Sequence, residues 1–124
     1  MHSRSSANRL SKFLYNASMK PLKFLGSSQD DLRDFPQEAR RAAGFELWQV
    51  QRGLEPSDWK PINSVGRGVK EIRIHVLGGW RVLYVATFAE AVYVLHCFHK
   101  TSAKIHRHDL ELARQRYRAI ESKQ

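Results

Sequence analysis

The sequence predicts a small α+β protein, in which an antiparallel meander sheet is packed by an N-terminal helical hairpin and followed by a C-terminal basic helix. Two patterns predict this class. Three β-prone runs with short connections lie between 71 and 98, and stretches with apolar residues at helical spacing lie before and after them. The 124 residues fit one domain, and 42% hydrophobic residues supply a modest core without disulfides or metal.

The meander is predicted at 71–76, 80–88 and 91–98, where Val, Ile, Tyr and Phe are frequent. The Gly-Gly pair at 78–79 indicates the first turn, and the Ala-Glu pair at 89–90 indicates the second. Connections this short join antiparallel neighbours.

Alternation along the first run predicts one face in the core and one face in water. The core face is Ile72, Ile74 and Val76, and the wet face is Glu71, Arg73 and His75. In the second run, the face that carries Arg81 is otherwise apolar. A guanidinium there is costly unless it lies near an edge, is paired, or meets an anion. Arg81 is therefore the first functional candidate; the alternative is that it reaches water past the glycine turn and only positions the hairpin.

The chain begins with residues 1–18, which hold three basic residues, several serines and no acid, and we expect a flexible N-terminal extension there. Organellar transit peptides share this composition, and Met19 offers an alternative start. The domain itself is expected over 19–124. It begins with a short edge strand at 22–25.

Capping residues predict the helical hairpin that follows. Ser27 or Ser28 begins a short helix, and Pro36 ends it. Pro36 also suits the first turn of a second helix that runs to about Arg52, with Gly53 as its C-cap. The apolar side of this hairpin is expected to cover the sheet.

Two further segments complete the predicted fold. Residues 54–68 contain two prolines and two glycines, and we expect a loop of the length that is often functional. Residues 105–121 are predicted to form a basic, amphipathic helix that packs against the rest of the domain.

Positive charge is the strongest compositional signal. The chain has 21 Lys and Arg against 12 Asp and Glu, which gives a net charge of +9. Residues 67–124 hold 11 basic and 5 acidic residues, whereas residues 19–66 hold 7 of each. This predicts a polyanionic partner for the sheet and the last helix. A basic surface kept for solubility, or for an acidic protein, gives the same composition.

Cysteine usage and hydropathy indicate the compartment. Cys97 is the only cysteine, so no internal disulfide forms and a reducing, cytoplasmic location is expected. The residue itself is predicted to be a small buried hydrophobe. No apolar run approaches the roughly 20 residues of a membrane helix, so we expect no membrane association.

Metal and cofactor chemistry have little support in the sequence. The densest group of potential ligands is His96, His99, His106 and His108. The two strand histidines face opposite sides, and neither a cysteine pair nor a carboxylate spacing completes a zinc signature. We therefore expect no metal and no cofactor.

Metal-free RNA cleavage requires fewer groups from the protein than metal or cofactor chemistry does, because the 2'-hydroxyl of the substrate is the nucleophile. The protein aligns it, moves protons, and neutralises the phosphate with arginine or lysine. Alternation along the strands predicts that Arg73, Arg81, His99 and Lys100 meet at one end of the sheet.

Five segments, together with the order of the elements, carry a resemblance to a known group of proteins. They are KPLKFLGSSQDDLRDFP, GRGVKEIRI, WRVLYVATF, VYVLHCFHK and DLELARQRY, within about residues 19–118. Together they resemble the RelE/ParE superfamily of bacterial toxins, and most closely its HigB-like, phage-derived branch. The RelE-like fold that this implies agrees with the α+β fold predicted above.

The resemblance implies the toxin of a type II toxin–antitoxin system. Such a toxin is an endonuclease that cleaves translated mRNA in the ribosome, and a helix-turn-helix antitoxin neutralises it. By position, Arg73 and Arg81 look like phosphate-binding or transition-state residues, Lys100 looks like the basic residue that ends the last strand, and His99 is a candidate for proton transfer. The side chains expected to bind RNA are Arg67, Lys70, Lys104 and Arg107.

Departures from the pattern leave the proton-transfer groups open. Thr101 follows Lys100 where many relatives have a second lysine, and His106 stands where they have proline. RelE-like enzymes often use a C-terminal tyrosine, for which Tyr117 is the residue available, within the last predicted helix.

Two other functions fit the same sequence: a ParE-like poison of DNA gyrase, and an inactive nucleic-acid-binding relative. The cationic strand residues favour RNA chemistry, because a protein that only binds gyrase has no need of converging arginine and lysine. Deletion of residues 1–18 is expected to leave folding and toxicity intact.

Overall fold

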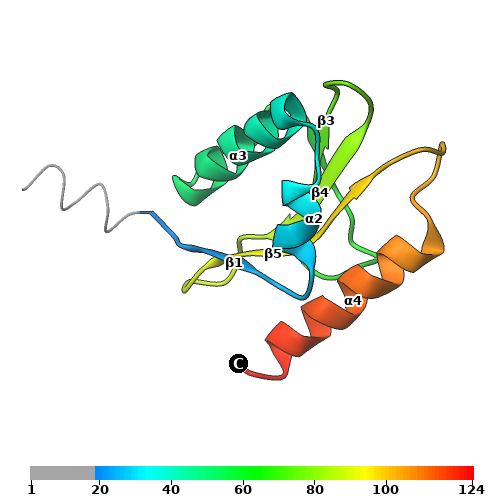
Figure 1. Cartoon of the computed structure of the whole chain (residues 1–124). Helices are drawn as coiled ribbons and strands as arrows, with labels where there is room; N and C mark the ends of the chain where they lie inside the picture. Colours follow the sequence, from blue (N-terminus) through cyan, green and yellow to red (C-terminus); the bar gives the residue numbers. More distant parts are fainter. Residues whose placement is uncertain (1–18) are drawn as a thin grey trace, which may run out of the picture.

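A computed structural model describes residues 19–124, so the predicted extension at 1–18 lies outside the described residues. The strands are β1 (Leu22–Phe24), β2 (Trp59–Pro61), β3 (Val69–Ile74), β4 (Trp80–Val85) and β5 (Val92–His99). The helices are α2 (Ser28–Arg33), α3 (Gln37–Gln51) and α4 (Arg107–Glu121). This arrangement confirms the α+β class, with the helical hairpin first, the meander next and the basic helix last (Figure 1).

The strands form one sheet in the order β1-β5-β4-β3-β2. The pairs β3–β4 and β4–β5 are antiparallel, as predicted for the meander, and β2 adds a further antiparallel strand beside β3. The edge strand β1 pairs with β5 in parallel, with Leu22 opposite Val92. The last strand along the chain therefore lies inside the sheet, between β1 and β4.

Helices cover both faces of the sheet (Figure 1). On one face, α2 and α3 pack against alternate residues of the central strands; this cluster includes Ala43, Leu47, Val50, Ile72, Val82, Tyr84 and Val94. On the other face, α4 packs against the residues between them; this cluster includes Val69, Leu83, Val85, Leu95, Ala113 and Tyr117. Cys97 is buried in the first cluster, which confirms its expected role as a small hydrophobe.

The predicted ends of the helices are largely confirmed. Pro36 occupies the N-cap position of α3 rather than its first turn, and Gly53 has the positive φ of 84° that suits a glycine after a helix. The Ser27 side chain does not cap α2; its hydroxyl donates to the Asp31 carboxylate at 2.7 Å.

Two sequence-based predictions are wrong. The segment 54–68 is not entirely a loop, because Trp59–Pro61 forms β2. Glu71 does not face water: it is completely buried, on the face of β3 that also carries Val69. The physical reason is that β2 and β4 flank β3 on both sides, and the cluster beneath α4 covers this face.

Strand extents differ by a few residues from the predicted runs. The second meander strand ends at Val85 rather than at 88, and the turn before it contains Leu77, a non-glycine residue with a φ of 55°. Within the described part of the chain, no helix is long and apolar enough to span a membrane.

Candidate nucleic-acid interface

Three lysines surround a hollow of about 430 Å³ between the β2–β3 connection and the β5–α4 connection. Lys60, Asn63 and Ser64 line it from β2 and the β2–β3 connection, and Lys100 and Lys104 line it from the β5–α4 connection. We call these five residues the cationic groove. No acidic side chain lines this hollow in the described structure.

Backbone contacts hold the walls of the cationic groove in place. The Lys100 N–H donates to the Gly79 carbonyl at 2.8 Å, which extends the β4–β5 pairing past the end of the strands. The Lys100 ammonium donates to the Ala103 carbonyl at 2.9 Å. From α4, Arg114 Nε donates to the Ser64 carbonyl at 2.8 Å, so the last helix fixes the opposite wall.

Arg81 takes part in a buried ionic network rather than standing alone. Its side chain is 9% exposed, and its Nε lies 3.4 Å from Glu71 Oε2. Lys60 Nζ approaches the other Glu71 oxygen at 3.7 Å. The Glu71 carboxylate oxygens and Arg81 Nε have no hydrogen-bond partner in the described structure. Of the environments considered from the sequence, burial with an ionic partner is the one observed, and Lys60 links this network to the cationic groove.

Arg73 lies opposite Arg81 in the β3–β4 register, but its side chain is engaged by Asp58. Arg73 Nη2 and Nε donate to Asp58 Oδ1 at 2.7 and 2.9 Å, and His75 Nε2 lies 2.9 Å from Asp58 Oδ2. Although partial burial acts in the opposite direction, these two basic partners lower the pKa of Asp58 below its ordinary value. The Arg73 charge is therefore partly neutralised by a carboxylate.

His99 lies at the same end of the sheet but on the other face. It is opposite Trp80 in the β4–β5 register, and the two rings stack with centroids 4.2 Å apart. The other strand histidine, His96, is buried against α4, with its Nε2 2.6 Å from Asp109 Oδ1 and its Nδ1 3.3 Å from Arg116 Nη1. His96 therefore connects β5 to α4.

The backbone thus brings the four predicted catalytic positions to one end of the sheet, whereas their side chains point to different surroundings. Lys100 lines the cationic groove, Arg81 is buried beside Glu71, and Arg73 is held by Asp58. His99 belongs to the opposite face.

The four predicted RNA-binding residues also separate in space. Lys104 lines the cationic groove, and Arg107 is exposed at the start of α4. Arg67 is exposed, and its carbonyl accepts the Tyr117 hydroxyl at 3.0 Å. Lys70 forms an ion pair with Glu55 at 2.9 Å, toward the other end of β3.

Sequence reasoning missed Lys60, because the segment that contains it looked like a loop with two prolines. The available signal was the alternation of Trp59, Lys60 and Pro61, and three residues are too few to distinguish a strand from a loop. Lys60 matters because it contacts both Glu71 and the hollow.

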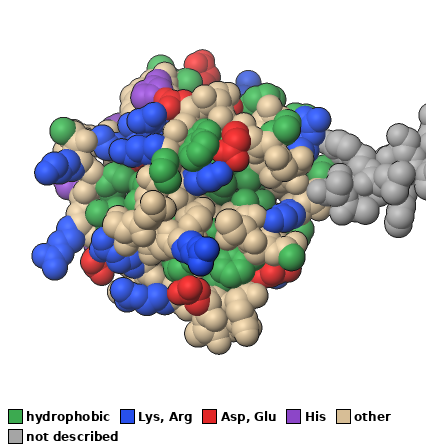
Figure 2. Space-filling view, turned by 180° about the vertical axis from the view of Figure 1, so that it is seen from behind, with side chains coloured by type: hydrophobic (Ala, Val, Ile, Leu, Met, Phe, Trp, Pro, Cys, Tyr) green, Lys and Arg blue, Asp and Glu red, His purple; other side chains and the backbone are tan. Residues whose placement is uncertain are grey.

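Charge on one side of the molecule is mainly positive. In the face shown in Figure 2, Lys and Arg side chains gather at the left of the view, and histidine lies above them. This is the side on which Figure 1 places the β5–α4 connection and the start of α4. No group of three or more histidine, cysteine, aspartate or glutamate side chains is placed to hold a metal ion within residues 19–124.

Comparison with known proteins agrees with this fold. A family model described as "Phage derived protein Gp49-like (DUF891)" matches residues 30–118, most of the chain. The chain belongs to the Gp49-like family. This phage-derived family is RelE-like and associated with toxin–antitoxin systems, so membership is consistent with a toxin that has an antitoxin partner. A search of curated proteins found no match to this Gp49-like chain.

Proposed function

We propose that this Gp49-like protein is the toxin of a type II toxin–antitoxin system and acts as a ribosome-dependent mRNA endonuclease of the HigB-like branch. The observation that carries the proposal is the cationic groove, in which Lys60, Lys100 and Lys104 surround a hollow without an acidic side chain. Such a positively charged surface is complementary to a polyanion.

The size and charge of the groove support a phosphodiester backbone as its ligand. Three ammonium groups, one from β2 and two from the β5–α4 connection, can contact successive phosphates, whereas a single anion would need one compact cluster. In the proposed reaction, the substrate 2'-oxygen attacks the adjacent phosphorus and its proton is removed. The bond to the 5'-oxygen breaks, the 5'-oxygen takes up a proton, and the products carry a 2',3'-cyclic phosphate and a 5'-hydroxyl.

The residues of the site have separate roles in this proposal. Lys100 and Lys104 neutralise the phosphate charge that increases in the transition state, and Lys60 holds the neighbouring phosphate. Arg81 contributes positive charge from beneath, although Glu71 offsets part of it. Arg73 and His99 act only if RNA binding releases them from Asp58 and Trp80, respectively.

The test is induction of the wild-type protein and of Lys100→Gln in a bacterial host, followed by measurement of growth and mapping of mRNA 5' ends. We expect the wild type to stop growth and to create new 5' ends within translated regions. Lys100→Gln should reduce cleavage by about 10- to 100-fold, because a charge that stabilises the transition state is lost.

Lys123→Gln is the matched control, since it removes an equal charge at the exposed C-terminal end of the chain. It should cleave like the wild type. Growth arrest with intact mRNA and damaged DNA would replace the proposal with a gyrase poison, and normal growth without any antitoxin would indicate an inactive nucleic-acid-binding relative.

A further inference from the structure

The outward side of α3 carries an aromatic pair that no other element of the described chain covers. Phe45 is 51% exposed and Trp48 is 37% exposed, and the two ring centroids lie 5.9 Å apart. In Figure 1, α3 lies at the outside of the molecule, with no other helix or strand of the described chain on its far side. Clustered exposed apolar side chains mark interaction sites, whereas single ones do not.

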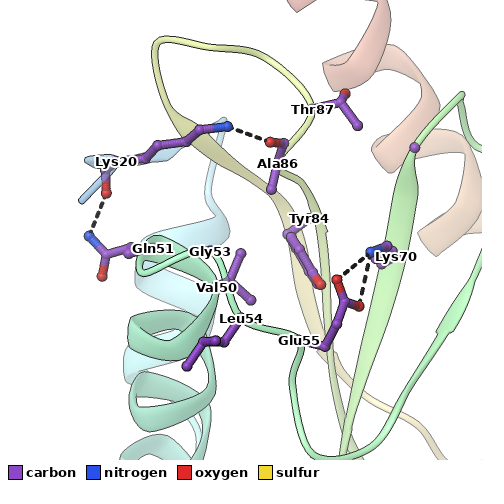
Figure 3. A pocket seen from close by; sticks show the side chains of 11 residues that line it. Lys20, Val50, Gln51, Gly53, Leu54, Glu55, Lys70, Tyr84, Ala86 and Thr87 are labelled. Atoms are coloured by element: carbon purple, nitrogen blue, oxygen red, sulfur yellow. Dashed lines mark hydrogen bonds and ion pairs between the residues drawn. The ribbon is translucent and has the colours of Figure 1, made fainter. Parts of the chain in front are cut away.

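Helical spacing places this pair on a second stripe of α3, opposite the buried one. The buried side includes Ala39, Ala43, Leu47 and Val50, and Figure 3 shows Val50 on the side of the helix toward Tyr84 of β4. We call the other side the outward stripe; its residues, at intervals of four, three and four, are Arg41, Phe45, Trp48 and Arg52. These are the intervals of a coiled-coil seam, so the shape that matches the outward stripe is another helix.

The positions beside the outward stripe let a second helix approach closely. They are small or neutral: Ala42, Gly44, Gln49 and Gln51. A Cβ atom at Gly44 would meet nothing within 4 Å, so the surface next to Phe45 is open at this point. The distance between two packed helices depends on the size of the side chains at their contact, and small ones shorten it.

The charges of the outward stripe favour an acidic partner. Arg41 and Arg52 are exposed at its two ends. Residues 41–54 contain one acid, Glu46, which is only 9% exposed and accepts a hydrogen bond from Ser57 Oγ at 2.8 Å. The outward stripe therefore presents apolar rings between two positive ends. A complementary helix has apolar residues at its centre and a carboxylate toward each end.

A second copy of this chain and single-stranded RNA both fit the outward stripe less well. In an antiparallel pair of α3 helices, Arg41 faces Arg52 of the second copy, and in a parallel pair each arginine faces its equivalent. Like charges meet in both arrangements, which is unfavourable. RNA bases stack on an open aromatic face, whereas the Trp48 ring already has Arg52 over it at 4.5 Å and Phe45 beside it.

We propose that the outward stripe of α3 is the docking site for a partner protein that presents an acidic amphipathic helix. Phe45 and Trp48 bury the apolar centre of that helix, and the two arginines pair with carboxylates at its ends. The site does not depend on the proposed RNA cleavage. The cationic groove is lined by Ile62 and Leu110 of the cluster beneath α4, whereas α3 packs on the other face of the sheet.

The test uses two labelled helical peptides as probes, each about three heptads long. Both have leucine in the central layers of the seam; one has glutamate in the layer at each end, and the other has lysine there. Fluorescence anisotropy measures the affinity of each peptide for the full chain. We expect the wild type to bind the glutamate peptide at least about 10-fold more tightly than the lysine peptide, the ratio that two exposed ion pairs supply.

Three variants separate the apolar and the charged contributions. Trp48→Ala should weaken binding of the glutamate peptide by about 10- to 30-fold, because an aromatic anchor at the centre of the contact is lost. Arg41→Glu combined with Arg52→Glu should reverse the preference, so that the lysine peptide binds better. The matched control, Arg118→Glu combined with Lys123→Glu, makes an equal change of charge at exposed positions elsewhere and should keep the wild-type preference.

Three results would overturn the proposal. The first is absence of binding of the glutamate peptide at millimolar protein, or an equal effect of the two double variants on the preference. The second is a concentration-dependent dimer in analytical ultracentrifugation that Trp48→Ala abolishes, which would assign the outward stripe to a second copy. The third is binding of single-stranded RNA that Trp48→Ala abolishes, which would assign it to RNA.

Discussion

Glu71 is the residue whose surroundings differ most from what its sequence position indicates. Its carboxylate is completely buried, without a hydrogen bond in the described structure, and lies within ion-pair distance of Arg81 and Lys60. Buried ion pairs often contribute little net stability, because desolvation offsets their attraction. Removal of one partner is costly because it leaves the other charge buried and uncompensated.

The Glu71–Arg81 pair is therefore expected to behave non-additively. Arg81→Met should lower the free energy of unfolding by about 3–5 kcal/mol, because Glu71 keeps only Lys60. The double variant with Glu71→Leu should recover most of that loss, since two apolar side chains replace two buried charges. Urea unfolding of the wild type, both single variants and the double variant measures the coupling. Additive effects would contradict a buried ionic network.

The same residues show how far the site was predictable. Composition and alternation placed Arg81 and Lys100 at one end of the sheet, and the backbone confirms this position. Alternation describes only the faces of a single strand, so it gave no sign that Glu71 would pair with Arg81 or that Asp58 would hold Arg73. These contacts depend on which strand lies beside β3, and that strand, β2, was not recognised.

At the level of elements, the predictable parts were those with strong local signals. The meander strands alternate over six residues or more, and the long helices have apolar stripes and recognisable ends. β2 has three residues, one of them proline, so no periodicity identifies it. The sequence indicated α4 as a packing helix, but its place on the second face depends on tertiary contacts.

The packing of α4 against the β2–β3 connection can be tested at Gly66. A Cβ atom there would lie 2.6 Å from the Tyr117 ring, which is buried and held by its hydrogen bond to Arg67. Gly66→Ala is expected to cost about 1–3 kcal/mol, because the ring must move out of a packed position. Thermal unfolding followed by circular dichroism measures the change.

Gly44→Ala provides the matched control within a helix. A Cβ at Gly44 of α3 meets nothing within 4 Å, so alanine should raise stability by about 0.5–1 kcal/mol through its better helix propensity. If both glycine variants changed stability in the same direction, the close contact between Gly66 and Tyr117 would not be what holds α4.

At the level of the whole molecule, the excess positive charge is concentrated in the second half of the chain. Basic residues outnumber acidic ones by 11 to 5 over residues 67–124, and the cationic groove is lined without an acid in the described structure. Under α3, in contrast, Lys70 forms an ion pair with Glu55. The cationic groove is therefore the candidate surface for the polyanion partner that net charge predicts.

Salt dependence tests how many phosphates the groove contacts. If Lys60, Lys100 and Lys104 each neutralise one phosphate, a plot of log affinity for single-stranded RNA against log salt should have a slope of about −2. Lys100→Gln should make this slope shallower by about 0.7, and Lys123→Gln should leave it unchanged. Fluorescence anisotropy with a 2'-deoxy substrate, which is not cleaved, gives both values. An unchanged slope in Lys100→Gln would place RNA elsewhere.

The position of β5 inside the sheet has a consequence for synthesis of the protein. β1 pairs with Val92–Val94, about 70 residues later in the chain, and β5 also pairs with β4. Neither core can close before β5 exists, because both clusters contain its residues, and an incomplete chain lacks the strand that joins β1 to β4. Contacts this distant in sequence also slow folding. A cell that makes this protein therefore has an interval, during each round of translation, in which the chain is present but not yet folded.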